Sequence, residues 1–304
     1  MDQSTAGTGP LVSAVIVFLN EERFIDEAVQ SVLAQRYPHW ELLLVDDGST
    51  DSSTQAALSY ADRFPQQIRY LSHDAGENRG ISASRNLGMR QARGAYLSYL
   101  DGDDALFPQA FAEQVDALEA RPEAAMVYGP IQWWYSWTGD AQDLERDYIE
   151  ELGVPPEAVI APPRLLPLFL RDKAAVPSGI MVRRSIAMEV GGFEDGFRGE
   201  YEDQVFCAKV ALRYPIFAAG RCWYRYRQHP DSMVAIALRS GATDASRRQF
   251  LDWLGGYLAA EGHPSRSLQR ALRLEHLRFT HPGLFHLMRR WERRVAKFVR
   301  RGAS

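Results

Sequence analysis

The first hundred residues alternate between short apolar runs and longer segments in which apolar residues recur at helical spacing. Continuous runs rich in β-branched residues are typical of strands buried on both faces of a parallel sheet, whereas the helical recurrence is typical of amphipathic helices. The strand-helix-strand order predicts an α/β protein with a mostly parallel central sheet flanked by helices. The predicted strands are residues 11–18, 41–45, 68–71 and 96–100, and the predicted helices are residues 21–35 and 82–92.

The same alternation continues less regularly in the middle of the chain. Residues 108–120 have an apolar face at helical spacing, residues 124–128 are a short apolar run, and residues 204–212 favour a helix. Residues 138–163 are acidic and then rich in proline, which is typical of a variable loop.

Composition excludes several classes of protein. The chain has 304 residues, of which 46% are hydrophobic and 24% charged, as in an ordinary soluble protein with a sizeable core. Its formal net charge of -4 gives no reason to expect nucleic-acid binding. Cys207 and Cys222 form neither a metal-ligand spacing nor a disulfide framework, so we expect two core residues in a reducing cytoplasm. No apolar run reaches about 18 residues, so we expect neither a transmembrane helix nor a secretory signal.

Carboxylates follow the predicted strand at residues 96–100. Asp101, Asp103 and Asp104 come directly after it, with Gly102 between the first two. Carboxylates this close repel one another unless a cation or protons neutralise them, and Mg²⁺ and Mn²⁺ favour oxygen ligands shared with substrate phosphates. Open α/β sheets also bind ligands at the carboxyl ends of their strands. The motif indicates either a metal-diphosphate site or an acidic loop that caps the next helix.

A second acidic strand end favours the metal-diphosphate site. Asp46 and Asp47 follow the predicted strand at residues 41–45, and a tight turn at residues 48–51 comes next. Because carboxyl ends of parallel strands share one edge of a sheet, we expect both acidic ends at the same crevice. A nucleotide fits between them, with its base and ribose near Asp46 and Asp47 and its diphosphate near the other end.

Two arginines lie between the acidic strand ends. Arg79 and Arg85 flank a segment in which Gly80 permits an unusual backbone angle and Ser82 is placed to cap a helix. Guanidinium groups bind diphosphates and carboxylates through paired hydrogen bonds. Both arginines are candidates for such contacts, and the alternative is a helix start with two surface arginines.

The order and spacing of these motifs resemble those of family 2 glycosyltransferases with the GT-A fold. The resemblance covers about the first 105 residues and implies a Rossmann-like sheet, a nucleotide-sugar donor and an inverting transfer. The segments that carry it are residues 15–20, 31–35, 44–51, 79–80 with 83–86, and 101–104.

The resemblance implies roles on the donor side. The loop after the first strand, with Phe18, Asn20 and Glu21, would hold the base and ribose together with Asp46 and Asp47. The donor nucleotide of such enzymes is usually UDP.

The segment at residues 101–104 resembles the DXD motif of the family. Asp103 would contact the divalent metal, Mn²⁺ or Mg²⁺. Asp101, beside Gly102, would face the ribose, and Asp104 would support the cluster or share the metal. Arg79 is a further candidate for the donor phosphates.

A second carboxylate pair marks the acceptor side. Asp203 precedes a predicted helix, where it either caps the helix and is held ionised by the dipole, or acts as general base on an acceptor hydroxyl. Glu202 and Asp203 resemble the ED motif of the family, which implies that Asp203 is the base and that Glu202 orients or contacts the acceptor. The family commonly has arginine where Lys209 stands, and the charge is kept.

The segment at residues 224–233 resembles the last motif of the catalytic domain. His229 would contact the metal or the departing diphosphate as this loop closes, and Arg225 and Arg227 would help to neutralise the leaving group. Before the variable loop, the aromatic cluster at residues 133–137 is either a platform on which an acceptor sugar stacks or a hydrophobic lid or core segment.

The predicted activity is that of a metal-dependent inverting glycosyltransferase of the hexosyltransferase class, which uses a UDP-sugar donor. One alternative is a nucleotidyltransferase, which predicts a glycine-rich basic loop after the first strand where this chain has Asn20-Glu21-Glu22. The other is a non-catalytic nucleotide-sugar-binding module, which predicts loss of the base, although Asp203 is present.

We divide the chain into a catalytic domain at residues 1–235 and a helical C-terminal extension at residues 236–304. Residues 284–301 show an apolar stripe opposite a basic face. This pattern fits an interfacial helix on an anionic membrane and equally a helix packed on protein. A cytoplasmic enzyme, peripheral on the membrane, would suit a glycan or lipid-linked acceptor in bacterial surface polysaccharide or glycolipid assembly.

Overall fold

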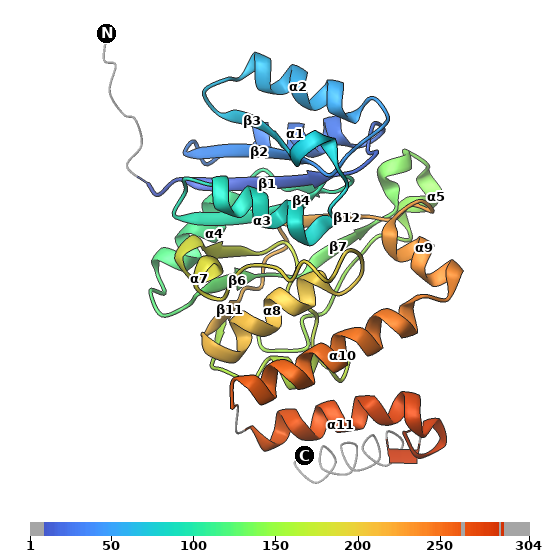
Figure 1. Ribbon diagram of the computed structural model, residues 1–304. Coiled ribbons are helices and arrows are strands. Elements are labelled where there is room, and N and C mark those ends of the chain that lie inside the picture. The colour runs from blue at the N-terminus through green and yellow to red at the C-terminus, as the bar shows by residue number, and fades with distance from the viewer. Residues whose placement is uncertain (1–8, 263–264, 286, 289–304) are drawn as a thin grey trace.

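The computed structural model describes residues 9–262, 265–285 and 287–288, and its centre is an eight-stranded sheet (Figure 1). The strand order is β3-β2-β1-β4-β10-β6-β11-β9. The strands are β1 (Val12–Phe18), β2 (Trp40–Asp46), β3 (Ile68–Ser72), β4 (Tyr96–Asp101), β6 (Met126–Tyr128), β9 (Ala158–Ile160), β10 (Met181–Arg183) and β11 (Ile216–Ala218).

The first four strands of that order are parallel and end together. The register pairs Phe18 with Asp46 and Val17 with Asp101, which brings the ends of β1, β2 and β4 to one edge of the sheet. β10 is antiparallel to β4 and β6, and β9 is antiparallel to β11, whereas β6 and β11 are parallel. The predicted α/β fold with a mostly parallel central sheet is confirmed.

Helices cover both faces of the sheet because successive strand residues point to opposite faces. Ile16 and Phe18 pack with one set of helices, and Val15 and Val17 pack with the other. The first set is α1 (Ile25–Leu33), α2 (Ser53–Arg63) and α4 (Ala110–Glu119). The second set is α3 (Ile81–Gln91), α6 (Leu166–Phe169), α7 (Arg184–Glu189) and α8 (Glu202–Arg213).

A second sheet of four strands brings the segment around residue 224 to the end of β4. Its order is β5-β12-β7-β8, with β12 parallel to β7 and antiparallel to β5. The strands are β5 (Ala105–Leu106), β7 (Ile131–Trp134), β8 (Tyr148–Ile149) and β12 (Tyr224–Arg227). Residues 138–163, predicted as a variable loop, contain two short strands, β8 and β9, and the short helix α5 (Ala141–Leu144).

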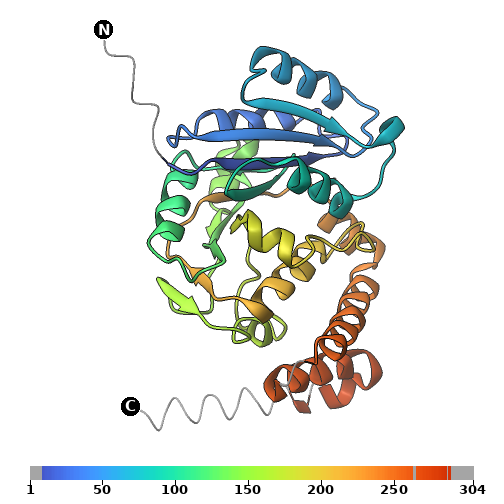
Figure 2. The same ribbon diagram turned by 60° about the vertical axis from the view of Figure 1, so that its left-hand side comes forward.

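Within the described residues, three helices follow β12 in the chain, and the last two of them lie at the end of the molecule opposite α2 and β3 (Figures 1 and 2). The three are α9 (Met233–Ser240), α10 (Thr243–Ala260) and α11 (Arg266–Thr280). Phe250 and Leu254 of α10 and Leu268 of α11 belong to the same hydrophobic cluster as α8. The division at residue 235 stays a prediction.

The amphipathic helix predicted at residues 284–301 falls mostly outside the described residues, so its partner stays a prediction. None of the described helices combines the length and the apolar run that a bilayer span needs. Cys207 is buried and Cys222 is half-buried, and both are free thiols.

Candidate active site

At the carboxyl end of β2, both carboxylate oxygens of Asp46 accept hydrogen bonds from other groups of the chain. Asp46 Oδ1 accepts from the main-chain N–H groups of Gly48 (3.1 Å) and Ser49 (2.7 Å). Its Oδ2 accepts from the hydroxyl groups of Thr54 (2.5 Å) and Tyr70 (3.1 Å). Asp46 therefore shapes the turn after β2, and its contact with a nucleotide stays a prediction.

Asp47 joins the same turn to the start of α3. Its Oδ1 accepts from the main-chain N–H groups of Arg79 (2.9 Å) and Gly80 (3.0 Å). The hydroxyl of Ser84 also donates to Oδ1 (2.9 Å), and the Gly80 N–H reaches Oδ2 as well (3.0 Å). Gly80 has φ of +89°, and an added Cβ would lie 3.0 Å from the Arg198 side chain, so this position favours glycine. Ser82 does not cap α3, because its hydroxyl donates to the carbonyl of Phe197 (2.6 Å).

The loop after β1 and the loop after β2 exchange hydrogen bonds. Asn20, which has a left-handed backbone (φ 59°), donates its N–H to Ser49 Oγ (3.0 Å) and accepts the Thr50 N–H at Oδ1 (2.8 Å). Glu22 donates its N–H to Asp51 Oδ2 (3.0 Å). The two loops therefore form one structural unit beside the strand ends.

Phe18 is the last residue of β1. Its side chain is 2% exposed and packs in the core with Ile16 and Leu44, and its carbonyl accepts the N–H of Asp47 (3.0 Å). The Phe18 side chain therefore packs in the core, and a contact of this residue with a nucleotide stays a prediction.

The loop after β4 lies tightly against the end of β1. Gly102 donates its N–H to the carbonyl of Val17 (3.0 Å). An added Cβ at Gly102 would lie 2.7 Å from Cβ of Phe18 and 3.2 Å from Cγ of Glu21. Glycine at this position brings Asp101 and Asp103 within reach of the loop after β1.

Asp104 is fully enclosed and holds β12. Its Oδ2 accepts from the hydroxyl of Tyr224 (2.6 Å), and its Oδ1 accepts from the N–H of Arg227 (2.7 Å). Burial, followed by the charges of Asp103 and Asp101, raises the pKa of Asp104 well above its ordinary value. Of the two roles predicted for Asp104, these contacts favour support of the cluster over sharing a metal.

Asp103 and His229 meet at the mouth of the site. His229 Nε2 lies 3.0 Å from Asp103 Oδ2. Nearby, burial raises the pKa of Glu21 to about 8, with further contributions from the charges of Asp103 and Asp101. The charges of Asp103 and Asp101 thus add to the effect of burial on Glu21 at the strand ends. Among the described residues, no three His, Cys, Asp or Glu side chains group as a metal site.

Arg227 is an internal support and does not face the crevice. Its side chain is 1% exposed, donates to the Asp103 carbonyl (2.5 Å) and pairs with Glu27 (2.7 Å). The rings of Phe24 (4.7 Å), Trp134 (4.3 Å) and Trp137 (5.3 Å) surround its guanidinium.

These contacts bear on two of the predictions. The enclosed guanidinium of Arg227 favours a structural role over direct contact with a leaving group, and its predicted help in neutralising that group stays a prediction. The aromatic cluster at residues 133–137 has two interpretations, a stacking platform or a hydrophobic lid or core segment. The core segment fits Trp134, which is 8% exposed and lies in β7. Trp137 also packs inward, edge-on against Phe24 at 5.4 Å.

The carboxylate pair Glu202 and Asp203 lies at the start of α8, next to Arg85. Glu202 is the first residue of the helix and accepts from Arg85 Nη1 (2.8 Å), and Arg85 Nη2 donates to Asp101 (2.6 Å). Arg85 therefore contacts carboxylates, one of its two predicted roles. Asp203 lies inside the first turn of α8 and accepts the N–H of Gln204 (2.6 Å).

The carboxyl groups of Glu202 and Asp203 are both harder to ionise than in water. Burial, followed by the charge of Asp203, raises the pKa of Glu202 to about 8. Burial also raises the pKa of Asp203, and the nearby charge of Arg85 opposes that rise. Raised carboxyl pKa values are typical of general bases that work near neutral pH.

A strained residue precedes this pair. Tyr201 has φ of 74°, a conformation rarely adopted outside glycine, and its ring stacks on Phe250 of α10 (5.4 Å). Local strain of this kind persists where packing enforces it, often at functional sites. The C-terminal helix α10 therefore supports the start of α8.

Arg79 and Arg225 lie away from these carboxylates. The Arg79 side chain is half exposed and pairs with Glu77 (3.3 Å), so its contact with donor phosphates stays a prediction. Arg225 packs its guanidinium over the rings of Phe107 (4.3 Å) and Trp134 (5.2 Å).

Residues 13–191, more than half of the chain, match the sequence family described as Glycosyl transferase family 2. The chain belongs to this family.

Relatives of this family 2 chain include longer proteins. It is 30% identical over 245 residues to the uncharacterized protein y4gI of Sinorhizobium fredii, covering 79% of the chain and 25% of y4gI. It is 32% identical over 254 residues to the O-antigen biosynthesis protein RfbC of Myxococcus xanthus, covering 83% of the chain and 18% of RfbC. The chain therefore spans a quarter or less of these two relatives.

Solved structures of low sequence identity share the fold of this family 2 chain. TarS 1-349 of S. aureus has a TM-score of 0.64 at 15% identity, covering 90% of this chain and 74% of that one. The same TarS fragment has also been solved in complex with UDP. The mannosyltransferase PcManGT of Pyrobaculum calidifontis, in complex with GDP-Man and Mn²⁺, has a TM-score of 0.59 at 18% identity, covering 88% and 70%.

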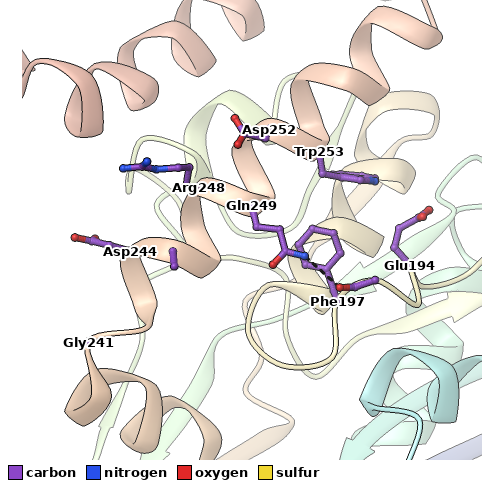
Figure 3. A pocket seen from close by; sticks show the side chains of 10 residues that line it. Glu194, Phe197, Gly241, Asp244, Arg248, Gln249, Asp252 and Trp253 are labelled. Carbon is purple, nitrogen blue, oxygen red and sulfur yellow. Dashed lines mark hydrogen bonds between the residues drawn. The ribbon is translucent and has the colours of Figure 1, made fainter.

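A large open cleft of this family 2 chain lies apart from the strand ends. Its volume is about 940 Å³, and it lies between the loop at residues 194–197 and α10 (Figure 3). The rings of Phe197 and Trp253 pack edge to face, with their centroids 6.1 Å apart, and Gln249 Nε2 donates to the carbonyl of Gly196 (3.1 Å). The strand-end carboxylates do not line this cleft, so we place the candidate active site elsewhere.

Sequence reasoning missed two supporting residues in this family 2 chain. The hydroxyl of Tyr224 bonds to Asp104, and Tyr201 carries the strain before Glu202. The period-2 pattern of residues 224–227 could have placed Tyr224 and Tyr226 on one face of a strand. No sequence signal marks the left-handed backbone of Tyr201, because it depends on packing against a distant helix.

Proposed function

We propose that this protein is a metal-dependent inverting glycosyltransferase that moves a sugar from a nucleotide diphosphate donor, a UDP-sugar, to an acceptor hydroxyl. One observation carries the proposal. Arg85 joins Asp101 at the end of β4 to Glu202 at the start of α8, beside Asp203. A donor-side carboxylate and a candidate base thus share one site, at the sheet edge where α/β proteins bind ligands.

The residues at the mouth of the site fit a divalent cation. Asp103 offers a carboxylate oxygen and His229 an imidazole nitrogen, 3.0 Å apart. Glu21 and Asp101 lie close enough to add negative charge there, since the charges of Asp103 and Asp101 contribute, after burial, to the raised pKa of Glu21. Mn²⁺ and Mg²⁺ are commonly held by one or two protein groups together with substrate phosphates. When bound, such a cation supplies positive charge to the leaving diphosphate.

Asp203 takes the proton of the acceptor hydroxyl as that oxygen attacks the anomeric carbon. Its raised pKa makes it a stronger base than an ordinary carboxylate. The bond from the anomeric carbon to the diphosphate oxygen breaks on the opposite face, so the sugar is inverted. Glu202, fixed by Arg85, holds the first turn of α8 in place beside the acceptor.

On the donor side, Asp101 faces the ribose, and the joined loops of Asn20 and Asp47 line the region where the base binds. Support for a nucleotide donor comes from the two similar folds solved with UDP and with GDP-Man and Mn²⁺. The name of the RfbC relative supports an acceptor in bacterial surface polysaccharide assembly. We extend this to a glycan or lipid-linked acceptor, reached from the cytoplasmic side of the membrane.

The first test is the thermal stability of the purified protein against UDP, dTDP and GDP and their sugars, each with Mn²⁺, Mg²⁺ or EDTA. A ligand that binds only the folded state raises the melting temperature, by an amount that grows with ligand concentration over Kd. We expect the largest rise with a UDP-sugar and Mn²⁺, and its loss in EDTA. Asp103→Asn should abolish the metal-dependent part, whereas Arg90→Met, on the exposed face of α3, serves as the matched control. Equal shifts in Mn²⁺ and EDTA would overturn the metal dependence.

A further inference from the structure

Arg85 bonds two carboxylates that belong to different halves of the site. Its Nη2 donates to Asp101 (2.6 Å) at the end of β4, and its Nη1 donates to Glu202 (2.8 Å) at the start of α8. Only 8% of the Arg85 side chain is exposed. The guanidinium therefore lies inside the protein between the donor side and the acceptor side.

The surroundings of Arg85 leave it little freedom. The ring of Phe193 lies 5.3 Å from the guanidinium carbon, and Phe193 stacks on Phe206 of α8 (4.5 Å, 15°). The neighbouring Asn86 fixes Phe193 twice, by accepting its N–H (2.8 Å) and donating to its carbonyl (2.8 Å). The guanidinium is thus held by α3, by the loop before α8 and by both carboxylates.

We propose that Arg85 is a positioning residue that couples nucleotide binding at Asp101 to the placement of Glu202, and through Glu202 to the placement of Asp203. The inference rests on the proposed function and deepens it. A planar guanidinium has donors at fixed angles, so a shift of one bonded carboxylate changes the geometry at the other. A lysine ammonium keeps the charge and lacks this planar two-sided geometry.

The test measures whether Glu202, on the acceptor side, affects nucleotide affinity through Arg85. The probe is UDP with Mn²⁺, titrated calorimetrically into the full chain. We expect Glu202→Gln to weaken UDP binding about fivefold and Arg85→Met to weaken it about tenfold, because a buried bridge is broken. In the Arg85→Met background, Glu202→Gln should weaken UDP binding no further.

Conservative replacement separates positioning from charge. In Arg85→Lys, we expect the melting temperature to recover toward that of the wild type while kcat with the donor stays at least tenfold reduced. Full recovery of kcat would assign Arg85 an electrostatic role only and overturn the proposal. Arg90→Met on the same helix is the matched control and should change neither UDP affinity nor melting temperature.

The outcomes also separate this inference from the proposed function. A wild-type protein that binds UDP, with an affinity unchanged by Glu202→Gln, overturns the coupling and leaves the glycosyltransferase proposal standing. A wild-type protein that binds none of the nucleotides overturns the proposed function. In that case, melting temperatures alone test whether Arg85 couples Asp101 to Glu202. Shifts from Asp101→Asn and Glu202→Gln should be non-additive with Arg85 present and additive in Arg85→Met, and additivity in both backgrounds overturns the bridge.

Discussion

At the carboxyl end of β2, both oxygens of Asp46 and both oxygens of Asp47 accept hydrogen bonds from the chain itself. At the carboxyl end of β4, Asp103 faces an imidazole instead, and the charge of Asp103 adds to burial in raising the pKa of Glu21 and of Asp104. Asp103 therefore differs from Asp46 and Asp47 in the groups that the fold places against its carboxylate, although all three follow strand ends of similar sequence.

The difference teaches which carboxylates are free to react. A buried carboxylate that accepts several N–H and O–H donors is stabilised in its ionised form and holds local structure. A carboxylate crowded by other acids destabilises the folded protein until a cation or a proton joins it. We therefore expect substitutions of Asp46 and Asp47 to act mainly on stability, and substitutions of Asp103 and Asp203 to act mainly on activity.

The largest effect is expected at Asp203, the candidate base, whose substitution should act on activity. Asp203→Asn removes the candidate base and keeps the shape, so kcat should fall about a thousandfold. UDP affinity, measured by calorimetry, should stay within about twofold, because Asp203 lies on the acceptor side. Turnover that survives this substitution would show that another group takes the proton.

The second prediction concerns the pH dependence of the same pair. A general base works when deprotonated, and burial raises the pKa values of Asp203 and Glu202, the latter to about 8. With saturating substrates, kcat should fall as the pH is lowered, with a midpoint above the ordinary aspartate pKa of about 3.9. A midpoint at about 3.9 would contradict the raised pKa of the base.

The third prediction compares the two strand ends directly by their stability. Asp47→Asn disrupts a buried acceptor of main-chain N–H groups and should lower the free energy of unfolding by about 3 kcal/mol. Asp103→Asn relieves repulsion and should change it by less than about 1 kcal/mol in EDTA. Urea unfolding of both variants and of the wild type measures the two changes in the free energy of unfolding. Equal changes for the two substitutions would contradict the prediction.

The smallest effect is expected where β4 meets β1. Gly102→Ala places a Cβ 2.7 Å from Cβ of Phe18 and should destabilise the protein by about 1–3 kcal/mol. Gly196→Ala is the matched control, because within the described residues an added Cβ there meets no atom within 4 Å. Urea unfolding should show a change within about 0.5 kcal/mol for the control.

Local patterns predicted most of the fold. The first four strands of the sheet follow continuous apolar runs, and the structure reproduces their order and direction. The short strands β8 and β9 were missed because they have little apolar pattern of their own and pair with distant segments. Sequence also misplaced the start of α8, because Glu202 enters the helix only through the left-handed backbone of Tyr201.

At the candidate site, sequence reasoning identified the acidic residues without separating their tasks. Asp46, Asp47, Asp103 and Asp104 look alike in a sequence, and their difference arises from what the fold places against them. The donors that satisfy Asp104 come from residues 224 and 227, more than a hundred positions away. Arginine is likewise a common phosphate ligand, so the sequence alone suggests that role for Arg227. Only the aromatic rings around its guanidinium show that the side chain is buried in the protein interior.

The exchange of hydrogen bonds between Asn20 and Thr50, and between Glu22 and Asp51, has a consequence for conformational entropy. Loops that must become ordered around a ligand lose that freedom at every binding event. Here the two loops are already ordered by folding, so a nucleotide bound as we propose would lose little loop entropy. More of its binding energy would then be available to align the sugar with the acceptor.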